Sequence, residues 1–321
     1  MKRLRPKQQQ PKPKLKQQLK KQPAPTRLKP NSKIIMKTPV NLTVGGRFRM
    51  KLAYDGTNFT GWAKQPGLRT VQGELLKEMQ VIFGKSKDDF GMRVAGRTDA
   101  GVHADAQIIH VDFTDAQIKR VGRSTDVAGR LTALLPDDIH VYTFERAPEG
   151  FDARFSATGR RYIYRIADGA SFKSPKLGRY ALYFTRVLDV ELMNDAAQAL
   201  LGLNDFGAFC KQRDGATTIR DLKKIKVSRV GGAAGIIEIE LVADAFCHNM
   251  CRSIVGALIK VGDGKFTSGK LTQLLKLAKR EHGYKTVEPH GLTLMEIFYP
   301  ANSKLASQAL LAKDTRSLDD N

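Results

Sequence analysis

The chain has 321 residues, of which 41% are apolar and 27% are charged, a composition typical of a globular protein with one or two domains. No apolar run approaches the roughly 18 residues of a membrane-spanning helix, so a membrane protein is not expected. The three cysteines, Cys210, Cys247 and Cys251, cannot build a disulfide framework, and their odd number favours a reducing compartment. The cytoplasm is therefore the expected location.

The formal net charge is +22. Residues 1–37 contain 10 Lys and 3 Arg without a single acidic residue, and the rest of the chain has 41 basic and 32 acidic residues. Because the body is basic even without its first residues, we expect a polyanionic partner, most simply a nucleic acid. A solvated basic surface without such a partner is the open alternative.

Residues 1–45 are rich in Lys, Gln and Pro and poor in apolar residues. Prolines break helices, and so few apolar residues cannot form a core, so this segment is predicted to be a disordered basic arm. It lacks the apolar centre of a signal peptide and is poor in Arg and Ser for a transit peptide. Met36 is a possible alternative start of the protein.

Residues 46–150 alternate between strand and helix patterns. Apolar residues recur at every second position in strands and along one stripe in helices. On this basis we expect strands at 47–54, 92–95, 107–113 and 139–144, and helices at 71–83 and 126–135, the second of which stops at Pro136.

Residues 151–300 repeat the same mixture, and residues 301–321 are predicted to be a flexible tail. The patterns predict a strand at the end of FDARFSATGRRYIYRI, helices at 190–201, 247–261 and 271–279, a hairpin of 219–230 with 236–242, and a closing strand at 292–298. The predicted fold class is α+β. It has two similar α/β domains, 46–150 and 151–300, whose mixed and mainly antiparallel sheets flank a central basic cleft.

Residues 92–105, MRVAGRTDAGVHAD, contain the most informative loop of the chain. A short apolar strand runs into a turn bracketed by Gly96 and Gly101, and glycine permits positive φ and close approach of a ligand. Asp99 in this loop is a candidate nucleophile, because the nearby Arg97 would stabilise its negative charge. An aspartate in a turn also commonly accepts hydrogen bonds from its own backbone, and this reading stays open.

Two further residues could complete a site around Asp99. Arg252 lies in an otherwise apolar helical segment, and a buried arginine needs a carboxylate partner. Tyr162 follows two arginines and could stack on a nucleic-acid base. Its alternative is a core aromatic residue, as we expect for Tyr164 on the same face.

The chain also contains two patterns of possible metal ligands. Asp99, His103 and Asp105 could form a carboxylate–imidazole metal site, but no second acidic cluster lies nearby in the sequence. Cys247, His248 and Cys251 in CHNMC could offer zinc ligands, but Cys247 and His248 are adjacent and no second ligand cluster exists, so the cysteines are expected to pack as small apolar groups. Neither pattern is the preferred interpretation, and the site of Asp99, His103 and Asp105 stays open as an alternative.

Four segments of the chain resemble the TruA-type tRNA pseudouridine synthases in order and spacing. They are AGRTDAGVHA, YDGTNFTGWAKQ, FDARFSATGRRYIY and FCHNMCRSIVGALIKVG, and the likeness covers roughly residues 47–300. The resemblance implies conversion of uridine to pseudouridine at positions 38, 39 and 40 of the tRNA anticodon stem-loop. It also implies a homodimer that binds tRNA and works without metal or cofactor.

The resemblance assigns roles to four residues of this chain. Asp99 corresponds to the nucleophile, Tyr162 to the tyrosine that stacks on the target base, Arg97 to the arginine of base flipping, and Arg252 to the partner of the aspartate. His103 belongs to the same motif without an assigned role. Where the family commonly has glycine, this chain has Ala106, which would be strained if that position requires positive φ.

Two other functions remain as alternatives. A non-catalytic RNA chaperone would also use a basic surface and aromatic strands. A metal-dependent hydrolase would use Asp99, His103 and Asp105.

Overall fold

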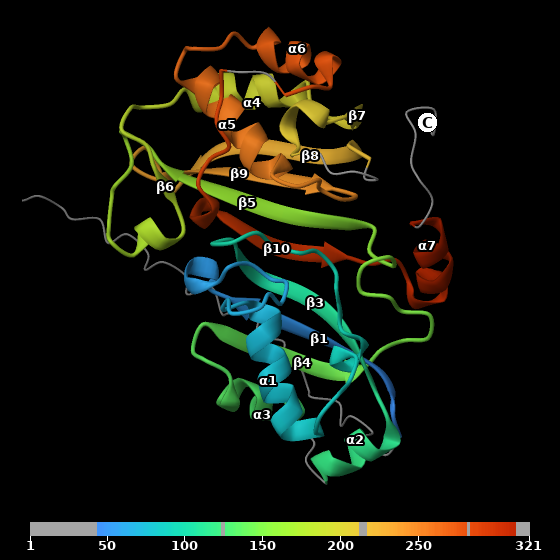
Figure 1. Ribbon diagram of the computed structural model, residues 1–321. Coiled ribbons are helices and arrows are strands. Elements are labelled where there is room, and N and C mark those ends of the chain that lie inside the picture. Colours follow the sequence, from blue (N-terminus) through green and yellow to red (C-terminus); the bar gives the residue numbers. More distant parts are fainter. Residues whose placement is uncertain (1–43, 123–125, 212–216, 281–282, 313–321) are drawn as a thin grey trace, which may run out of the picture. The chain divides into compact units, whose positions relative to one another are not determined.

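The computed structural model describes residues 44–122, 126–211, 217–280 and 283–312 (Figure 1). The predicted basic arm, apart from residues 44 and 45, lies outside these ranges, so its disorder stays a prediction. None of the helices in the described ranges is long and apolar enough to cross a lipid bilayer.

The first half of the chain follows the predicted order of elements closely. Its elements are β1 (Gly46–Tyr54), α1 (Val71–Phe83), β2 (Arg93–Val94), β3 (His103–Phe113), α2 (Asp115–Val121), α3 (Val127–Leu134) and β4 (Ile139–Arg146). α1 begins where the Thr70 side chain accepts a hydrogen bond from the Gly73 amide, and its apolar stripe is buried. The short α2 was not predicted, although Thr114 and Gln117 form a capping box at its start.

The second half also contains every predicted element. They are β5 (Gly159–Ala167), β6 (Leu182–Tyr183), α4 (Val190–Gln198), β7 (Gly202–Asp205), β8 (Ile219–Val230), β9 (Ile236–Ala243), α5 (Met250–Gly262), α6 (Gly269–Leu277), β10 (Leu292–Phe298) and α7 (Leu305–Leu311). The predicted flexible tail is wrong for its first part, because Leu305 of α7 is buried against Phe151 and Ala153. Residues 313–321 lie outside the described ranges.

One mixed sheet runs through both halves, whereas the patterns predicted a sheet in each (Figure 1). Its main order is β4-β1-β3-β10-β5-β9-β8-β7, and all its pairs are antiparallel except β3 with β10 and β5 with β6. The mainly antiparallel character is thus confirmed. The last strand, β10, joins the halves, a pairing that sequence periodicity cannot reveal. The domain division at residue 150 and the central basic cleft stay predictions.

The sheet splits next to its central strand. β3 pairs with β10 at only two positions, His103 with Thr293 and Ala104 with Leu294. Further along β3 the partner is β2 instead, with Val94 opposite Ile109. The loop that follows β2 and carries Asp99 therefore starts where β3 and β10 part.

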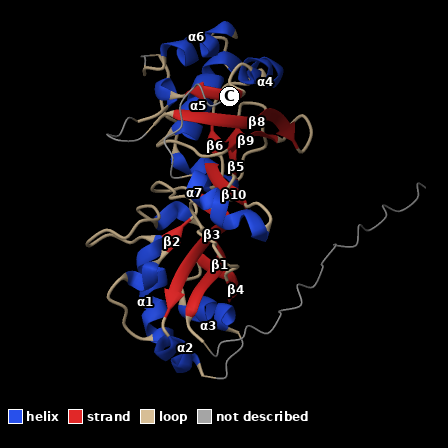
Figure 2. Cartoon of the chain, turned by 90° about the vertical axis from the view of Figure 1, so that its right-hand side faces the viewer, coloured by secondary structure: helices blue, strands red, loops and turns tan. Residues whose placement is uncertain are grey.

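The two faces of the sheet differ in chemistry. On one face, side chains such as Met50, Tyr54 and Tyr162 pack into a single core with residues of the helices. Figure 2 shows the strands in red and the helices in blue, from a direction at right angles to that of Figure 1. On the other face, charged side chains pair across strands, for example Arg49 with Glu145 at 2.7 Å. Side chains of one strand alternate between these faces, so the face of each site residue follows from its register.

Candidate active site

The backbone of residues 95–102, here called the Asp99 loop, is held from several sides. The Ala95 amide donates to the Ile108 carbonyl at 2.9 Å, and the Trp62 amide donates to the Thr98 carbonyl at 3.1 Å. The Gly101 amide donates to the Phe59 carbonyl at 3.2 Å. Because these partners belong to β3 and to the segment before α1, the loop is attached to rigid elements on both flanks.

Buried polar side chains fix the residues next to Asp99. The hydroxyls of Tyr54 and Thr98 lie 2.7 Å apart, and the Gln107 amide donates to the Gly96 carbonyl at 2.7 Å. Burial raises the pKa of Tyr54 to about 12, so this hydroxyl keeps its proton at neutral pH. The Asp99 side chain itself remains 37% exposed, which leaves its carboxylate open to a reactant.

Glycine is required at two positions around this loop. Gly101 has φ +75°, as its place in the turn predicted. Gly61 has φ +93°, and a Cβ there would lie 3.0 Å from the Thr98 carbonyl oxygen. Gly61 therefore permits the close approach of two loops, a role that the sequence pattern did not indicate.

Two side chains from the second half of the chain reach the Asp99 carboxylate. Arg252 Nη1 lies 3.9 Å from Oδ2, and His248 Nε2 lies 3.6 Å from Oδ1. The Arg252 side chain is 17% exposed, and its Nε donates to the Val287 carbonyl at 2.7 Å. The expected carboxylate partner of this arginine is thus in place, although the distance is that of a loose ion pair.

Tyr162 approaches the loop from β5. It is buried, its ring packs edge-on against Phe246 with 5.2 Å between centroids, and a Cβ on Gly96 would lie 3.8 Å from its hydroxyl. Burial raises its pKa, and the negative charge of Asp99 adds to this. Across the described ranges, no hydrogen bond reaches this hydroxyl. Tyr164, in contrast, donates to the Glu288 carbonyl at 2.7 Å, as expected of a core tyrosine.

Arg97, two residues before Asp99, is exposed. Within the part of the chain that the structure describes, its side chain forms no ion pair. The Arg97 side chain is therefore free to contact a ligand, but its position alone assigns no role.

The cysteines depart from the prediction. Cys210 and Cys247 form a disulfide with 5.7 Å between their Cα atoms, so Cys247 is not a simple apolar packing group. The pairing depends on two distant segments that also share a hydrogen bond from the Lys211 amide to the His248 carbonyl, at 2.9 Å. Cys251 is free and buried, as predicted.

The same segment contains two site residues that sequence reasoning missed. Phe246 and His248 flank Cys247 in residues 244–249, here called the Phe246 loop, and contact Tyr162 and Asp99 respectively. His248 stands close to Arg252 in the sequence, but it precedes α5, which begins at Met250, so helical spacing did not indicate its position.

His103 and Asp99 do not share partners. On β10, Thr293 lies opposite His103, and the next residue, Leu294, lies opposite Tyr162. Neighbouring residues of a strand point to opposite faces, so the side chains of His103 and Tyr162 lie on opposite faces of the sheet. His103 Nδ1 accepts from the Gly56 amide at 3.0 Å, and its Nε2 lies 2.9 Å from the Arg179 carbonyl oxygen. Burial lowers the pKa of His103, consistent with a neutral ring that bridges backbone groups.

No group of three or more His, Cys, Asp or Glu side chains among the described residues is placed to hold a metal ion. The carboxylate–imidazole alternative is therefore not formed by the geometry of Asp99, His103 and Asp105. Ala106 lies within β3 and does not have positive φ, so the strain considered for this position is absent.

Comparison with known proteins agrees with the motif resemblance found in the sequence. A family model described as tRNA pseudouridine synthase matches residues 196–300. Among curated proteins, tRNA pseudouridine synthase A of Streptomyces avermitilis is 45% identical over 278 residues, which are 85% of this chain and 94% of that protein. The proteins of the same name from Streptomyces griseus and Mycobacterium leprae are 43% and 41% identical and cover 85% and 88% of this chain, and 94% and 99% of their own lengths.

Solved structures add little. A chain of a Cbf5-Nop10-Gar1 complex is 10% identical, with a TM-score of 0.30, and the match covers 77% of this chain and 58% of that one. This likeness is too distant to support a conclusion.

Proposed function

The chain belongs to the tRNA pseudouridine synthase A family, a family of isomerases, and from this premise we propose that it converts uridine to pseudouridine at positions 38, 39 and/or 40 of the tRNA anticodon stem-loop. The observation that carries the proposal is the partly exposed Asp99 carboxylate, which lies beside Arg252 and His248 and close to Tyr162. A cationic and aromatic setting of this kind suits a nucleophile that acts on a nucleobase.

The reaction needs neither electron transfer nor a second substrate. The N1–C1′ bond breaks, the uracil turns within the site, a C5–C1′ bond forms, and the C5 proton is released while N1 gains a proton. Asp99 attacks either C1′ or C6 and is regenerated when the new bond has formed. Arg252 stabilises the negative charge of Asp99 before and after each turnover.

The target uridine lies in or beside a stem, so it must leave the base stack at a cost of a few kcal/mol. Arg97, exposed at the rim of the Asp99 loop, fills the vacated position in this proposal. Tyr162 stacks on the flipped uracil, and its raised pKa keeps the hydroxyl protonated at neutral pH.

The test is release of tritium from tRNA labelled at uridine C5, measured with excess EDTA. The enzyme should release tritium in EDTA, and the Asp99→Asn variant should lose release by at least about 10⁴-fold while it still binds tRNA. Asp105→Asn is the matched control, because its exposed carboxylate on β3 should be dispensable. Loss on chelation, or in Asp105→Asn, would instead support the hydrolase, and no release from any tRNA would support the chaperone.

Substrate tRNAs with a single labelled uridine at position 38, 39 or 40 resolve the site preference in the same assay. Tyr162→Phe, which keeps the ring, should retain most of the activity that Tyr162→Leu loses. Equal and complete loss in both would show that the hydroxyl, and not stacking, is what the reaction needs.

We also propose a homodimer, on the basis of the family alone, and a location in the cytoplasm, on the basis of the odd number of cysteines. Light scattering on the purified protein tests the assembly. A mass equal to one chain of 35.6 kDa at micromolar concentration would contradict the dimer.

A further inference from the structure

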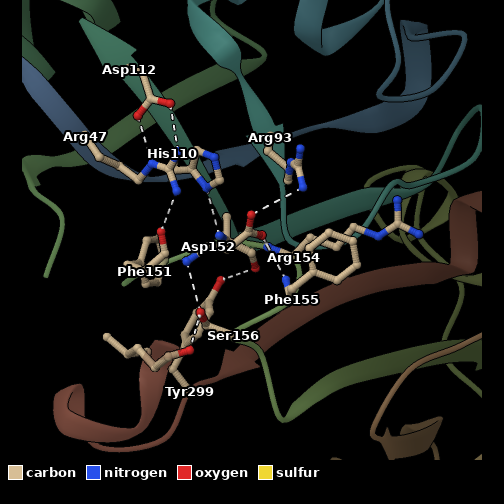
Figure 3. A network of polar contacts seen from close by, with 12 residues as sticks. Arg47, Arg93, His110, Asp112, Phe151, Asp152, Arg154, Phe155, Ser156 and Tyr299 are labelled. Carbon is tan, nitrogen blue, oxygen red and sulfur yellow. Dashed lines mark hydrogen bonds and ion pairs between the residues drawn. The ribbon is translucent and has the colours of Figure 1, made fainter. Parts of the chain in front are cut away.

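A turn formed by residues 152–156 lies directly before β5 and displays Arg154 and Phe155 (Figure 3). Asp152 Oδ1 accepts hydrogen bonds from the amides of both residues, at 2.8 and 2.9 Å. The Ser156 amide donates to the Asp152 carbonyl at 3.0 Å, and the Ser156 hydroxyl donates to the Leu305 carbonyl at 3.0 Å. The turn is thus rigid although its tip faces solvent.

The first half of the chain supports this turn from the other side. His110 Nδ1 accepts from the Ala153 amide at 2.9 Å, and Arg47, paired with Asp112, donates to the Phe151 carbonyl at 2.9 Å (Figure 3). Burial lowers the pKa of His110 to about 4, and the positive charge of Arg47 acts in the same direction. His110 is therefore neutral at pH 7 and free to accept this bond.

The turn is also tied to the Asp99 loop. The buried Arg160 guanidinium donates through one nitrogen, Nη2, to the carbonyls of Ala95 and Arg154, both at 2.9 Å. These two backbone positions are therefore close neighbours. Arg154 lies beside the entry to the Asp99 loop, although 55 positions separate it from Asp99 in the sequence.

At the tip, two cations surround one aromatic ring. The guanidinium carbons of Arg93 and Arg154 each lie 5.4 Å from the Phe155 ring centroid (Figure 3). Arg93 also contacts Asp152, with 3.3 Å between Nη1 and Oδ2. Arg154 is exposed and, within the described ranges, has no carboxylate within ion-pair distance. Arg154 thus places a positive charge without an acidic partner beside the half-buried ring of Phe155, and the turn holds both residues in place. Such a pair can bind a nucleotide, the arginine through its phosphate and the ring through the planar face of its base.

We propose that Arg93, Arg154 and Phe155 form a subsite for one nucleotide of the tRNA outside the catalytic position, with its phosphate on Arg154 and its base or ribose against Phe155. The inference rests on the proposed function, because it needs tRNA in the site of Asp99. Arg93 orients the turn through Asp152 and adds charge at the phosphate.

The subsite predicts a defect in binding rather than in chemistry. Arg154→Ala should raise KM for tRNA about tenfold, with kcat changed less than threefold, because one phosphate contact is lost. The dependence of log Kd on log salt should become shallower by roughly 0.7 to 0.9. Phe155→Leu should weaken binding without changing this slope, since it removes the π face but no charge.

Arg154→Lys keeps the charge and should retain the salt slope. Lys276→Ala, which removes an exposed cation from α6, is the matched control and should change neither KM nor slope. All binding is measured in the Asp99→Asn background, so that turnover does not deplete the substrate, and thermal unfolding checks that each variant is folded.

The outcomes separate the two proposals. If the unaltered enzyme releases no tritium from tRNA, the proposed function fails whatever the binding data show. If it turns over normally while Arg154→Ala matches Lys276→Ala in both KM and salt slope, the subsite is wrong and the proposed function stands.

Discussion

The Asp99 loop on one side of the site and the Phe246 loop with α5 on the other are positioned by different kinds of contact. Backbone hydrogen bonds from Trp62 and Gly101, together with the close approach of Gly61, fix the Asp99 loop. The opposite side reaches the carboxylate only through the long side chains of Arg252 and His248, at 3.9 and 3.6 Å. The Asp99 carboxylate is therefore placed by the backbone, whereas the Arg252 and His248 side chains can adjust their distance to it.

Among changes that leave Asp99 itself intact, the largest effect should come from Arg252 on α5. Arg252→Ala removes the positive charge next to Asp99 and should lower kcat by roughly 10²-fold, whereas Arg252→Lys should recover about a tenth to a half of the activity. The lysine keeps the charge but cannot reproduce the Nε bond to Val287. Lys260→Ala, on the same helix, is the control, and an equal loss there would mean that only the general basic field matters.

A smaller effect should follow from a substitution that disturbs the Asp99 loop but changes no charged residue. Gly61→Ala places a methyl group 3.0 Å from the Thr98 carbonyl oxygen at φ +93°, which should cost about 1–3 kcal/mol and lower kcat about tenfold by moving Asp99. Gly67→Ala is a matched control, because it has φ +71° with nothing within 4 Å. Equal kcat values in both variants, from single-turnover kinetics, would show that the loop position is not set by this contact.

The smallest effect concerns the coupling of the two halves through His110. Its pKa of about 4 in the folded protein lies below the ordinary value of 6.5, so protonation favours the unfolded chain, and stability should fall as the pH drops from 6.5 toward 4. Between pH 7 and pH 5 the loss should reach up to about 2 kcal/mol.

Urea unfolding at both pH values measures this loss. His110→Asn retains an acceptor for the Ala153 amide and should remove this part of the pH dependence. The contribution of His103, whose pKa is also lowered, would remain. An unchanged pH dependence in His110→Asn would assign the whole effect to other groups.

Local periodicity predicted the elements well, because most of them bury one regular face. β1 alternates between buried apolar and basic residues, and the predicted bounds of α1, 71–83, agree with the structure. The short α7 was missed because seven residues with one buried leucine leave too weak a pattern. The glycine-bracketed loop made Asp99 a candidate, the two arginines before Tyr162 made that residue another, and the motif resemblance then assigned their roles.

Most contacts between distant segments could not be predicted from the sequence. Nothing local indicates that Cys210 lies beside Cys247, or that Arg160 joins Ala95 to Arg154. The position of Arg252 near Asp99 was predicted on two grounds, because a buried arginine in an apolar helix requires a carboxylate partner and because the family resemblance names Asp99 as that partner. The split between β3 and β10 depends on strand pairing, which sequence patterns specify weakly.

The central place of β10 has a consequence for synthesis on the ribosome. β10 is the last strand in chain order, yet it hydrogen-bonds to both β3 and β5. The halves can begin to fold during translation, but the Asp99 loop and Tyr162 come into register only after residues 292–298 have left the exit tunnel. An incomplete chain would thus lack the finished arrangement around Asp99, which forms only when nearly the whole polypeptide has emerged.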